Sequence, residues 1–335
     1  MDHFTAHRLR FDAEVTTPIE IGEHKGSAIR GALYHSLRRR FCLNHQARDC
    51  RYCSLAPPQH GNPEKSATCP VCSLVSTLGP ESERGVDLPR PYTIEPPLGD
   101  GLSYEPSQHL EFGLTLFAEA LHYFPYIILA VQAMETTGLG KRTKTNGWRR
   151  GTFRVRHVLA LNPLTGESHE VAAAGQSLVA VPDVPITHRQ VLRAASTWSA
   201  TGKITLNFLT PTRITDAKHL QHRPFFRPIF QRLLERLSAL ARQFSDTPMT
   251  VDFGSLVKAA NEVRVVEDHT RWVEVRSYST RQGRATPTSG FIGQVSFEAE
   301  EWTPFLPWLL WGQFTHVGKD AVKGNGWYVM SNEIQ

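Results

Sequence analysis

A sequence pattern that occurs twice limits the folds open to this chain more than any other feature. Residues 138–148 read GLGKRTKTNGW and residues 318–327 read GKDAVKGNGW, so both run Gly-Lys, a few mixed residues and Asn-Gly-Trp. A second pair of similar segments, TPIEI at 17–21 and TPTRI at 210–214, precedes a helical pattern in each half. Two such pairs, in the same order and at similar separations, indicate two copies of one supersecondary unit.

Hydrophobic periodicity gives both halves the same order of elements. In the first half it predicts strands at 8–15, 89–95, 110–117 and 152–161, with helices at 25–41 and within 118–137. In the second half it predicts strands at 203–209, 263–278 (bent), 290–297 and 327–330, with helices at 225–244, 249–260 and 304–314. Strand-helix-strand-strand-helix-strand is the ferredoxin-like order. We therefore expect an α+β fold of two tandem ferredoxin-like (RRM-like) βαββαβ domains, whose open sheet faces suit RNA.

The length of the chain agrees with a division into two domains. Its 335 residues are too many for one ordinary core and suit two domains of about 150 residues each. We place them at 1–165, with a cysteine-rich insertion at 42–78, and at 202–335, with a glycine-rich loop at 312–328; 166–201 is a linker with a short helix near 189–199. No apolar run approaches the ~20 residues that span a bilayer, and the N-terminus lacks the apolar stretch of a signal peptide. These features favour a cytoplasmic protein without a membrane partner.

The cysteines predict a structural metal site. All five lie within residues 42–72, and Cys50-x2-Cys53 is followed by Cys69-x2-Cys72. This spacing is typical of a four-cysteine zinc knuckle, with Cys42 as an alternative ligand in place of one partner. The segment between the pairs is rich in Pro, Gly, Asn and Gln, so it has no core of its own. Four thiolates leave no open position on the metal, so the zinc would be structural; free thiols or a disulfide are the alternatives.

Both copies of the Gly-Lys pattern are candidate sites for a polyanion, which the formal charge of +5 also favours. In the second copy, glycine turns with exposed N–H groups and two lysines suit an anion. Its candidate RNA-binding residues are Gly318, Lys319, Lys323, Gly324, Asn325 and Gly326. In the first copy, a basic hairpin suits a phosphate backbone. Its candidates are Lys141, Arg142, Lys144, Arg149 and Arg150. A structural glycine hairpin and a solvated charged loop are the alternatives.

Several segments together carry a family resemblance. They are SAIRGAL (27–33), the cysteine insertion, PRPY (89–92), GLTLF (113–117) and, most specifically, 290–297 with GQFTHVGKDAVKGNGWY (312–328). The sequence resembles, over nearly its whole length, the CRISPR-associated repeat-RNA processing endoribonucleases of the RAMP superfamily. The resemblance implies tandem ferredoxin-like domains, binding of CRISPR repeat RNA in a precursor transcript, and cleavage without a catalytic metal. Other CRISPR effector subunits are further expected partners.

The reaction that the resemblance implies needs proton transfer and charge stabilisation. The ribose 2′-OH attacks the adjacent phosphate and leaves a cyclic phosphate and a 5′-OH. Histidine suits the proton transfers because its unperturbed pKa is about 6.5, and lysine or arginine suits the charge on the phosphorane.

The resemblance places the catalytic histidine on or just after the first helix. The sequence offers His35 first, on the polar face of the predicted helix with Gly31, Arg38 and Arg39, and then His45 and His24. His316 suits a phosphate or base contact, as do Arg38 and Arg39. Lys25 and Tyr34 are nearby helpers, whereas Arg30 stands where some relatives carry histidine and cannot act as a base.

Two hypotheses from other classes remain open at this point. The chain is alternatively a non-catalytic RAMP subunit that holds guide RNA in a CRISPR effector complex. A more distant alternative is a zinc-stapled adaptor between proteins, with no role in RNA binding.

Overall fold

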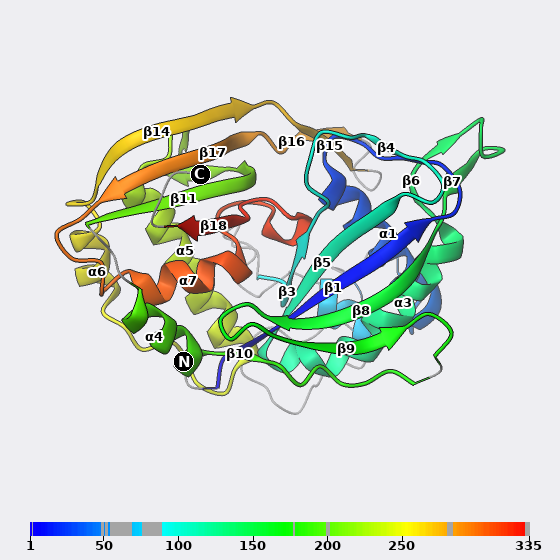
Figure 1. The fold of residues 1–335 in the computed structure, drawn as a ribbon, viewed down its shortest axis with the longest axis horizontal. Coiled ribbons are helices and arrows are strands. Elements are labelled where there is room, and N and C mark those ends of the chain that lie inside the picture. Colours follow the sequence, from blue (N-terminus) through cyan, green and yellow to red (C-terminus); the bar gives the residue numbers. More distant parts are fainter. Residues whose placement is uncertain are drawn as a thin grey trace.

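Two antiparallel sheets, one from each half of the chain, form the frame of the molecule (Figure 1). The structure, a computed structural model, describes residues 1, 3–47, 50, 53, 69–75, 89–176, 178–198, 202–279 and 284–331. Most of the cysteine-rich insertion predicted at 42–78, including the polar segment between the two cysteine pairs, lies outside the described residues.

The first sheet has the strand order β3-β5-β1-β8-β9. Its strands are β1 (Thr5–Val15), β3 (Tyr92–Glu95), β5 (His109–Phe117), β8 (Phe153–Asn162) and β9 (Glu167–Ala173), and β10 (Ile186–Thr187) pairs with β1. Helices α1 (Lys25–Phe41) and α3 (Phe124–Thr137) pack on each other, with Pro125 in the first turn of α3 as the sequence predicts. Alternate residues of β1, such as Leu9 and Phe11, share a buried core with Leu33 and Ile128 of the helices.

The second sheet has the strand order β14-β17-β11-β18. Its strands are β11 (Lys203–Thr212), β14 (Arg264–Val273), β17 (Gly290–Glu298) and β18 (Tyr328–Ser331), with helices α5 (Phe226–Phe244), α6 (Phe253–Ala259) and α7 (Leu306–Thr315). Numbered along the chain, β1-β3-β5-β8 and β11-β14-β17-β18 both assemble in the order second, third, first, fourth. Both halves therefore have the same ferredoxin-like arrangement. No helix among the described residues is long and apolar enough to span a bilayer.

Shorter elements connect and extend the two sheets. They are β2 (Ile19–Glu20) with β4 (Ser103–Tyr104), β6 (Leu139–Thr143) with β7 (Arg149–Gly151), β12 (Ile214–Asp216) with β13 (His219–Gln221), β15 (Arg276–Ser279) with β16 (Arg284–Pro287), α2 (Pro70–Val75), α4 (His188–Thr197), η3 (Ala118–Tyr123) and η4 (Ala321–Lys323).

Two segments differ from the sequence-based prediction. The bent strand expected at 263–278 is interrupted, because the Ser289 hydroxyl donates to Glu274 and accepts from the Val275 N–H, and β15 then pairs with β16 instead of continuing β14. The segment expected to be a linker at 166–201 supplies β9 to the first sheet, and its helix α4 packs on α7. A capping box between Thr187 and Gln190 starts that helix.

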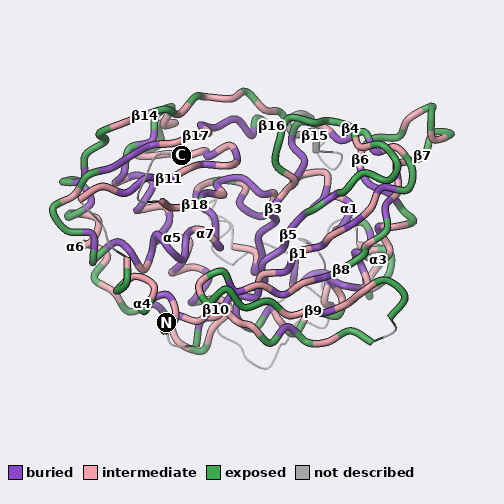
Figure 2. The backbone as a smooth tube through the Cα atoms, viewed as in Figure 1, coloured by how far each residue is buried: buried purple, intermediate pink, exposed green. Residues whose placement is uncertain are grey.

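Each half contributes residues to the core of the other. Figure 2 shows that buried segments run through both sheets. Phe4 belongs to the second core, where its ring stacks on Phe117 at 6.0 Å and meets the edge of Trp311 at 5.1 Å. Val322, from the glycine-rich loop, belongs to the first core. The relative position of the halves is thus fixed by apolar packing.

Candidate nucleic-acid interface

Helix α1 presents His35 to solvent. Ile29, Leu33 and Leu37 recur every four residues and are buried against the first sheet, so the helix has a fixed rotation. His35 lies away from this stripe and is exposed, whereas its neighbour Ser36 is buried.

The charges of three guanidinium groups act on the His35 imidazole. Partial burial, followed by the positive charges of Arg150, Arg38 and Arg30, lowers the pKa of His35 from its ordinary value of 6.5. Arg30 and Arg38 come from α1, whereas Arg150 comes from β7 in the basic hairpin. The fold therefore brings together two groups that the sequence placed far apart, and their charges oppose protonation of this imidazole.

His24 is held in a structural role, contrary to its sequence-based place among the catalytic candidates. It caps α1: its Nδ1 accepts the Ser27 N–H at 3.0 Å, so its Nε2 carries the proton and donates to Asn325 Oδ1 at 2.7 Å. Burial is the main cause that lowers its pKa. Although His24 lines a cleft of about 160 Å³ at the junction of the halves, together with Lys25 and Lys323, both of its nitrogens are already engaged.

The other predicted residues near α1 have mixed placements. His45 and Arg39 are exposed, His45 in a turn after the helix. Arg38 donates to the Ala47 carbonyl at 2.7 Å and so also holds that turn. Lys25 points elsewhere, since it is buried and donates to the Gly99 carbonyl at 2.7 Å. The Tyr34 ring lies beside His35, with centroids 5.6 Å apart, and its hydroxyl contacts Cys50 Sγ at 3.8 Å.

The glycine-rich loop is closed, which contradicts the open anion cradle predicted from the sequence. Its N–H groups find acceptors inside the protein: Lys319 on the Arg213 carbonyl at 3.1 Å, Gly324 on Ala321 at 3.0 Å, and Gly326 on Pro211 at 3.2 Å. Gly324, Asn325 and Gly326 are buried, Gly318 is half-buried, and Lys323 is half-buried in an ion pair with Asp320 at 2.8 Å. Lys319 is the exposed cation of this loop.

The loop glycines serve close packing. All three have positive φ, and a Cβ on Gly326 would lie 1.8 Å from the Val317 carbonyl oxygen. A Cβ on Gly324 would lie 2.6 Å from Pro96 Cδ. Only glycine permits such approaches: Gly326 packs the loop on itself, and Gly324 packs it against the first half.

His316 is fully buried, so its predicted contact with RNA is wrong for this conformation. Its ring stacks on Trp327 with centroids 6.0 Å apart, and no hydrogen-bond partner is within reach of either nitrogen among the described residues. Burial, followed by the charge of Arg236, lowers its pKa to about 3. The imidazole is a neutral core group.

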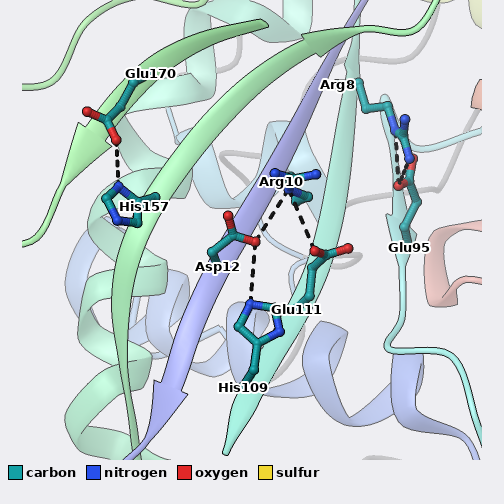
Figure 3. Close-up of polar contacts among 8 residues, drawn as sticks. All are labelled: Arg8, Arg10, Asp12, Glu95, His109, Glu111, His157 and Glu170. Atoms are coloured by element: carbon teal, nitrogen blue, oxygen red, sulfur yellow. Dashed lines mark hydrogen bonds and ion pairs between the residues drawn. The ribbon is translucent and has the colours of Figure 1, made fainter.

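The open face of the first sheet carries paired charges instead of the free surface that an RNA-recognition module offers (Figure 3). Arg8 binds Glu95 at 2.8 Å, and His157 binds Glu170 at 2.6 Å. Asp12, His109 and Glu111 place possible metal-ligand atoms within 4.8 Å of one another, but Arg10 lies between the two carboxylates, 3.4 Å from Asp12 and 3.7 Å from Glu111. We assign this cluster to an ion-pair network, which leaves little charge for a phosphate.

The basic hairpin β6–β7 keeps its cations at the surface. Lys141, Arg142, Lys144 and Arg149 are exposed, and Arg150 is half-buried beside α1. Lys141 also pairs with Glu20 at 2.6 Å.

One residue of this hairpin, Trp148, has a largely exposed side chain and is not among the candidates predicted from the sequence. The signal that marks it is a tryptophan in a segment with five cations and no acidic residue.

Four of the five cysteines influence one another electrostatically. All five are buried and unbridged. Hydrogen bonding with the Cys50 thiol, burial, and the proximity of Cys69 and Cys53 raise the pKa of the Cys72 thiol, so these four sulfurs are neighbours. The Tyr34 hydroxyl contacts Cys50 Sγ, and the Asn44 amide donates to Cys53 Sγ at 3.7 Å, as outer groups do around metal-bound thiolates. Thiols of this kind are the ligands that structural zinc prefers.

Comparisons with known proteins agree with the fold. A family model described as an N-terminal domain matches residues 4–184, and the model of the CRISPR-associated endoribonuclease Cas6 matches residues 206–328. A solved Cas6 product complex has a TM-score of 0.56 at 15% identity over 98% of this chain and 99% of that chain. Thermus thermophilus Cas6 gives 0.53 at 15% over the same shares. A partial Cas6-RT-Cas1–Cas2 complex gives 0.60 at 14% over 98% of this chain and 46% of that chain.

These matches define the fold: the chain folds like solved Cas6 proteins, and its residues 206–328 match the model of the CRISPR-associated endoribonuclease Cas6. Over residues 4–184, more than half of its length, the chain belongs to the family whose model is described as an N-terminal domain. No curated protein matches the chain.

Proposed function

We propose that this protein is an endoribonuclease that binds CRISPR repeat RNA and cleaves the precursor transcript, without a catalytic metal, to give guide RNA. The observation that carries the proposal is the exposed His35, whose pKa is lowered by burial and by the charges of Arg150, Arg38 and Arg30, where α1 meets the basic hairpin. A neutral imidazole accepts a proton, and guanidinium groups stabilise the charge that develops on phosphate.

In the proposed reaction, His35 takes the proton of the ribose 2′-OH as that oxygen attacks the neighbouring phosphorus. The bond from phosphorus to the 5′-oxygen then breaks, and the leaving oxygen takes a proton from the His35 imidazolium. The products are a 2′,3′-cyclic phosphate and a 5′-hydroxyl, so protons and charges balance without a metal. The three arginines offset the negative charge that develops on the phosphorane. Electrostatic stabilisation of such developing charge is usually the largest single contribution to catalysis.

The proposed partners follow from the same comparisons. A Cas6 relative is solved with its product, and another in a complex named for Cas1 and Cas2. We place repeat RNA and other CRISPR proteins as partners of this chain, in the cytoplasm. The competing function is a subunit that only holds guide RNA, for which the basic hairpin would suffice. Incubation of purified protein with its repeat RNA in EDTA separates the two: cleavage identifies the enzyme, and stable binding of intact RNA identifies the holder.

The environment of His35 makes a prediction about its titration. Because Arg150 repels the imidazolium, Arg150→Gln should raise the pKa of His35 toward 6.5 in the RNA-free protein. The imidazole C–H signal, assigned by its loss in His35→Ala, reports this pKa in an NMR titration. Lys144→Gln, at the tip of the same hairpin, is the control and should leave it unchanged. An unshifted value in Arg150→Gln would mean that the hairpin does not reach His35.

We further propose that Cys50, Cys53, Cys69 and Cys72 bind one structural zinc ion, with Cys42 as the alternative for one of them. Bound zinc would crosslink a segment that lacks its own core. Elemental analysis of the purified chain should give about one zinc per chain, and Cys72→Ser should lower it well below that. Cys42→Ser is the matched variant, because it keeps the zinc if the four-cysteine set is right. A zinc-free wild-type protein would remove this proposal.

A further inference from the structure

The β6–β7 hairpin presents one aromatic side chain in a basic environment. Trp148 is 63% exposed, more than any other aromatic side chain among the described residues. The hairpin projects away from both sheets at the upper right of Figure 1, and its tip is exposed in Figure 2. A single exposed apolar residue is ordinary by itself. Trp148 differs in how its backbone is held and in the charges around it.

The turn that carries Trp148 is well fixed. The Trp148 N–H donates to the Thr143 carbonyl at 2.8 Å, and the Gly147 N–H donates to the Lys144 carbonyl at 2.9 Å. The Asn146 side-chain amide reaches out of the hairpin to the Pro18 carbonyl at 2.7 Å. Trp148 has a φ of 61°, a conformation that non-glycine residues rarely adopt. The backbone thus fixes the position from which the indole projects.

The base of the hairpin is fixed against the rest of the protein as well. A Cβ on Gly140 would lie 2.2 Å from the Glu20 carbonyl oxygen, and one on Gly151 would lie 2.1 Å from the Pro18 carbonyl oxygen. This backbone-to-backbone packing requires glycine at both positions. It fixes the base of the hairpin against residues 18–20.

Cations lie close to the indole in space and in sequence. The Lys144 ammonium lies 5.9 Å from the centroid of the Trp148 ring, and the exposed Arg149 follows in the sequence. Arg150, which acts on His35, is two residues away, or about 7 Å along a strand. Aromatic faces alternating with cations are the surface on which single-stranded nucleic acids stack their bases.

We propose that Trp148 stacks on a base of the repeat RNA within a few nucleotides of the phosphate at His35, while Lys144 and Arg149 bind the phosphates on either side. This proposal rests on RNA being the ligand of the protein, as proposed above. It makes Trp148 a binding and positioning residue: it fixes the strand, and takes no part in proton transfer.

Two RNA probes of equal charge separate stacking from electrostatic attraction. The probes are a fluorescein-labelled twelve-nucleotide oligoadenylate and an abasic ribose-phosphate oligomer of the same length. Trp148→Ala should weaken oligoadenylate binding about tenfold, since stacking on an aromatic side chain contributes about 1–3 kcal/mol per base. Binding of the abasic oligomer should not change. Lys144→Ala should weaken both, because it removes a phosphate contact.

Two controls make the result decisive. Phe225→Ala removes another exposed aromatic residue, 51% exposed and outside the hairpin, and should leave both probes bound as before. Circular dichroism confirms that each variant is folded. Equal losses for both probes in Trp148→Ala, or no loss for either, would overturn the stacking proposal. If wild-type protein cleaves no repeat RNA but the loss specific to oligoadenylate persists, the endonuclease proposal fails and the stacking proposal stands.

Discussion

Replacing His35 by alanine should lower the single-turnover rate of repeat-RNA cleavage by about 10²- to 10⁴-fold, the usual contribution of a general acid–base group. The reason is local: His35 is the exposed imidazole on α1 whose pKa is lowered in part by three arginine side chains, and alanine neither accepts nor returns a proton. RNA affinity should change much less, because the arginines remain. Quenched-flow or gel measurements at saturating protein give the rate directly.

Controls decide whether such a loss belongs to His35. His109→Ala removes an exposed histidine on the sheet face, bound in an ion pair with Asp12 at 3.7 Å, and should cleave at the wild-type rate. Added imidazole should restore part of the activity of His35→Ala and none to a misfolded protein. If His45→Ala loses cleavage while His35→Ala keeps it, the proton transfer belongs to the turn after α1 and the assignment to His35 is wrong.

The second large effect concerns the junction of the two halves. Gly26 lies in the first turn of α1, where a Cβ would lie 1.8 Å from the Lys323 carbonyl oxygen. Gly26→Ala must therefore push α1 and the glycine-rich loop apart, and should lower the free energy of unfolding by about 1–3 kcal/mol or more. Because His24 caps the same turn and donates to Asn325, this hydrogen bond should break as well.

The same helix supplies a control of opposite sign. A Cβ on Gly31 meets no atom within 4 Å, so Gly31→Ala should raise the free energy of unfolding by about 0.5–1 kcal/mol through the better helix propensity of alanine. Urea unfolding of both variants measures the two changes. Equal effects on stability would show that the loop does not pack on Gly26.

The duplicated architecture could be predicted from the sequence because its signals are local. Helix α1 follows from the spacing of Ile29, Leu33 and Leu37, and β1 follows from alternation that the strand retains in the fold. The strand order also follows, since the order of elements suggests one familiar arrangement. The structure of the segment expected to be a linker was harder to predict, because the pairing of β9 with β8 depends on the register between the two strands.

The candidate site could be predicted only in part, because burial at the junction depends on contacts far apart in the sequence. His316 and Asn325 look like ligand residues beside glycines, but packing against Trp327 and His24 makes them interior groups. The closed loop depends likewise on Pro96, more than two hundred residues earlier. On the open sheet face, the sequence alone shows the charged residues but not which residues of the neighbouring strands lie opposite them. In contrast, His35 and the basic hairpin are surface features, and these the sequence does indicate.

The central claim is that the protein cleaves RNA by attack of the RNA's own ribose 2′-OH on the adjacent phosphate, without a metal. The most direct measurement uses the repeat RNA with and without a single 2′-deoxy nucleotide on the 5′ side of the cut, in EDTA, with bound zinc measured before and after. We expect the unmodified RNA to give a 2′,3′-cyclic phosphate and a 5′-hydroxyl, and the deoxy RNA to bind but remain intact. Cleavage of the deoxy RNA, or cleavage that requires an added divalent cation, would contradict the claim.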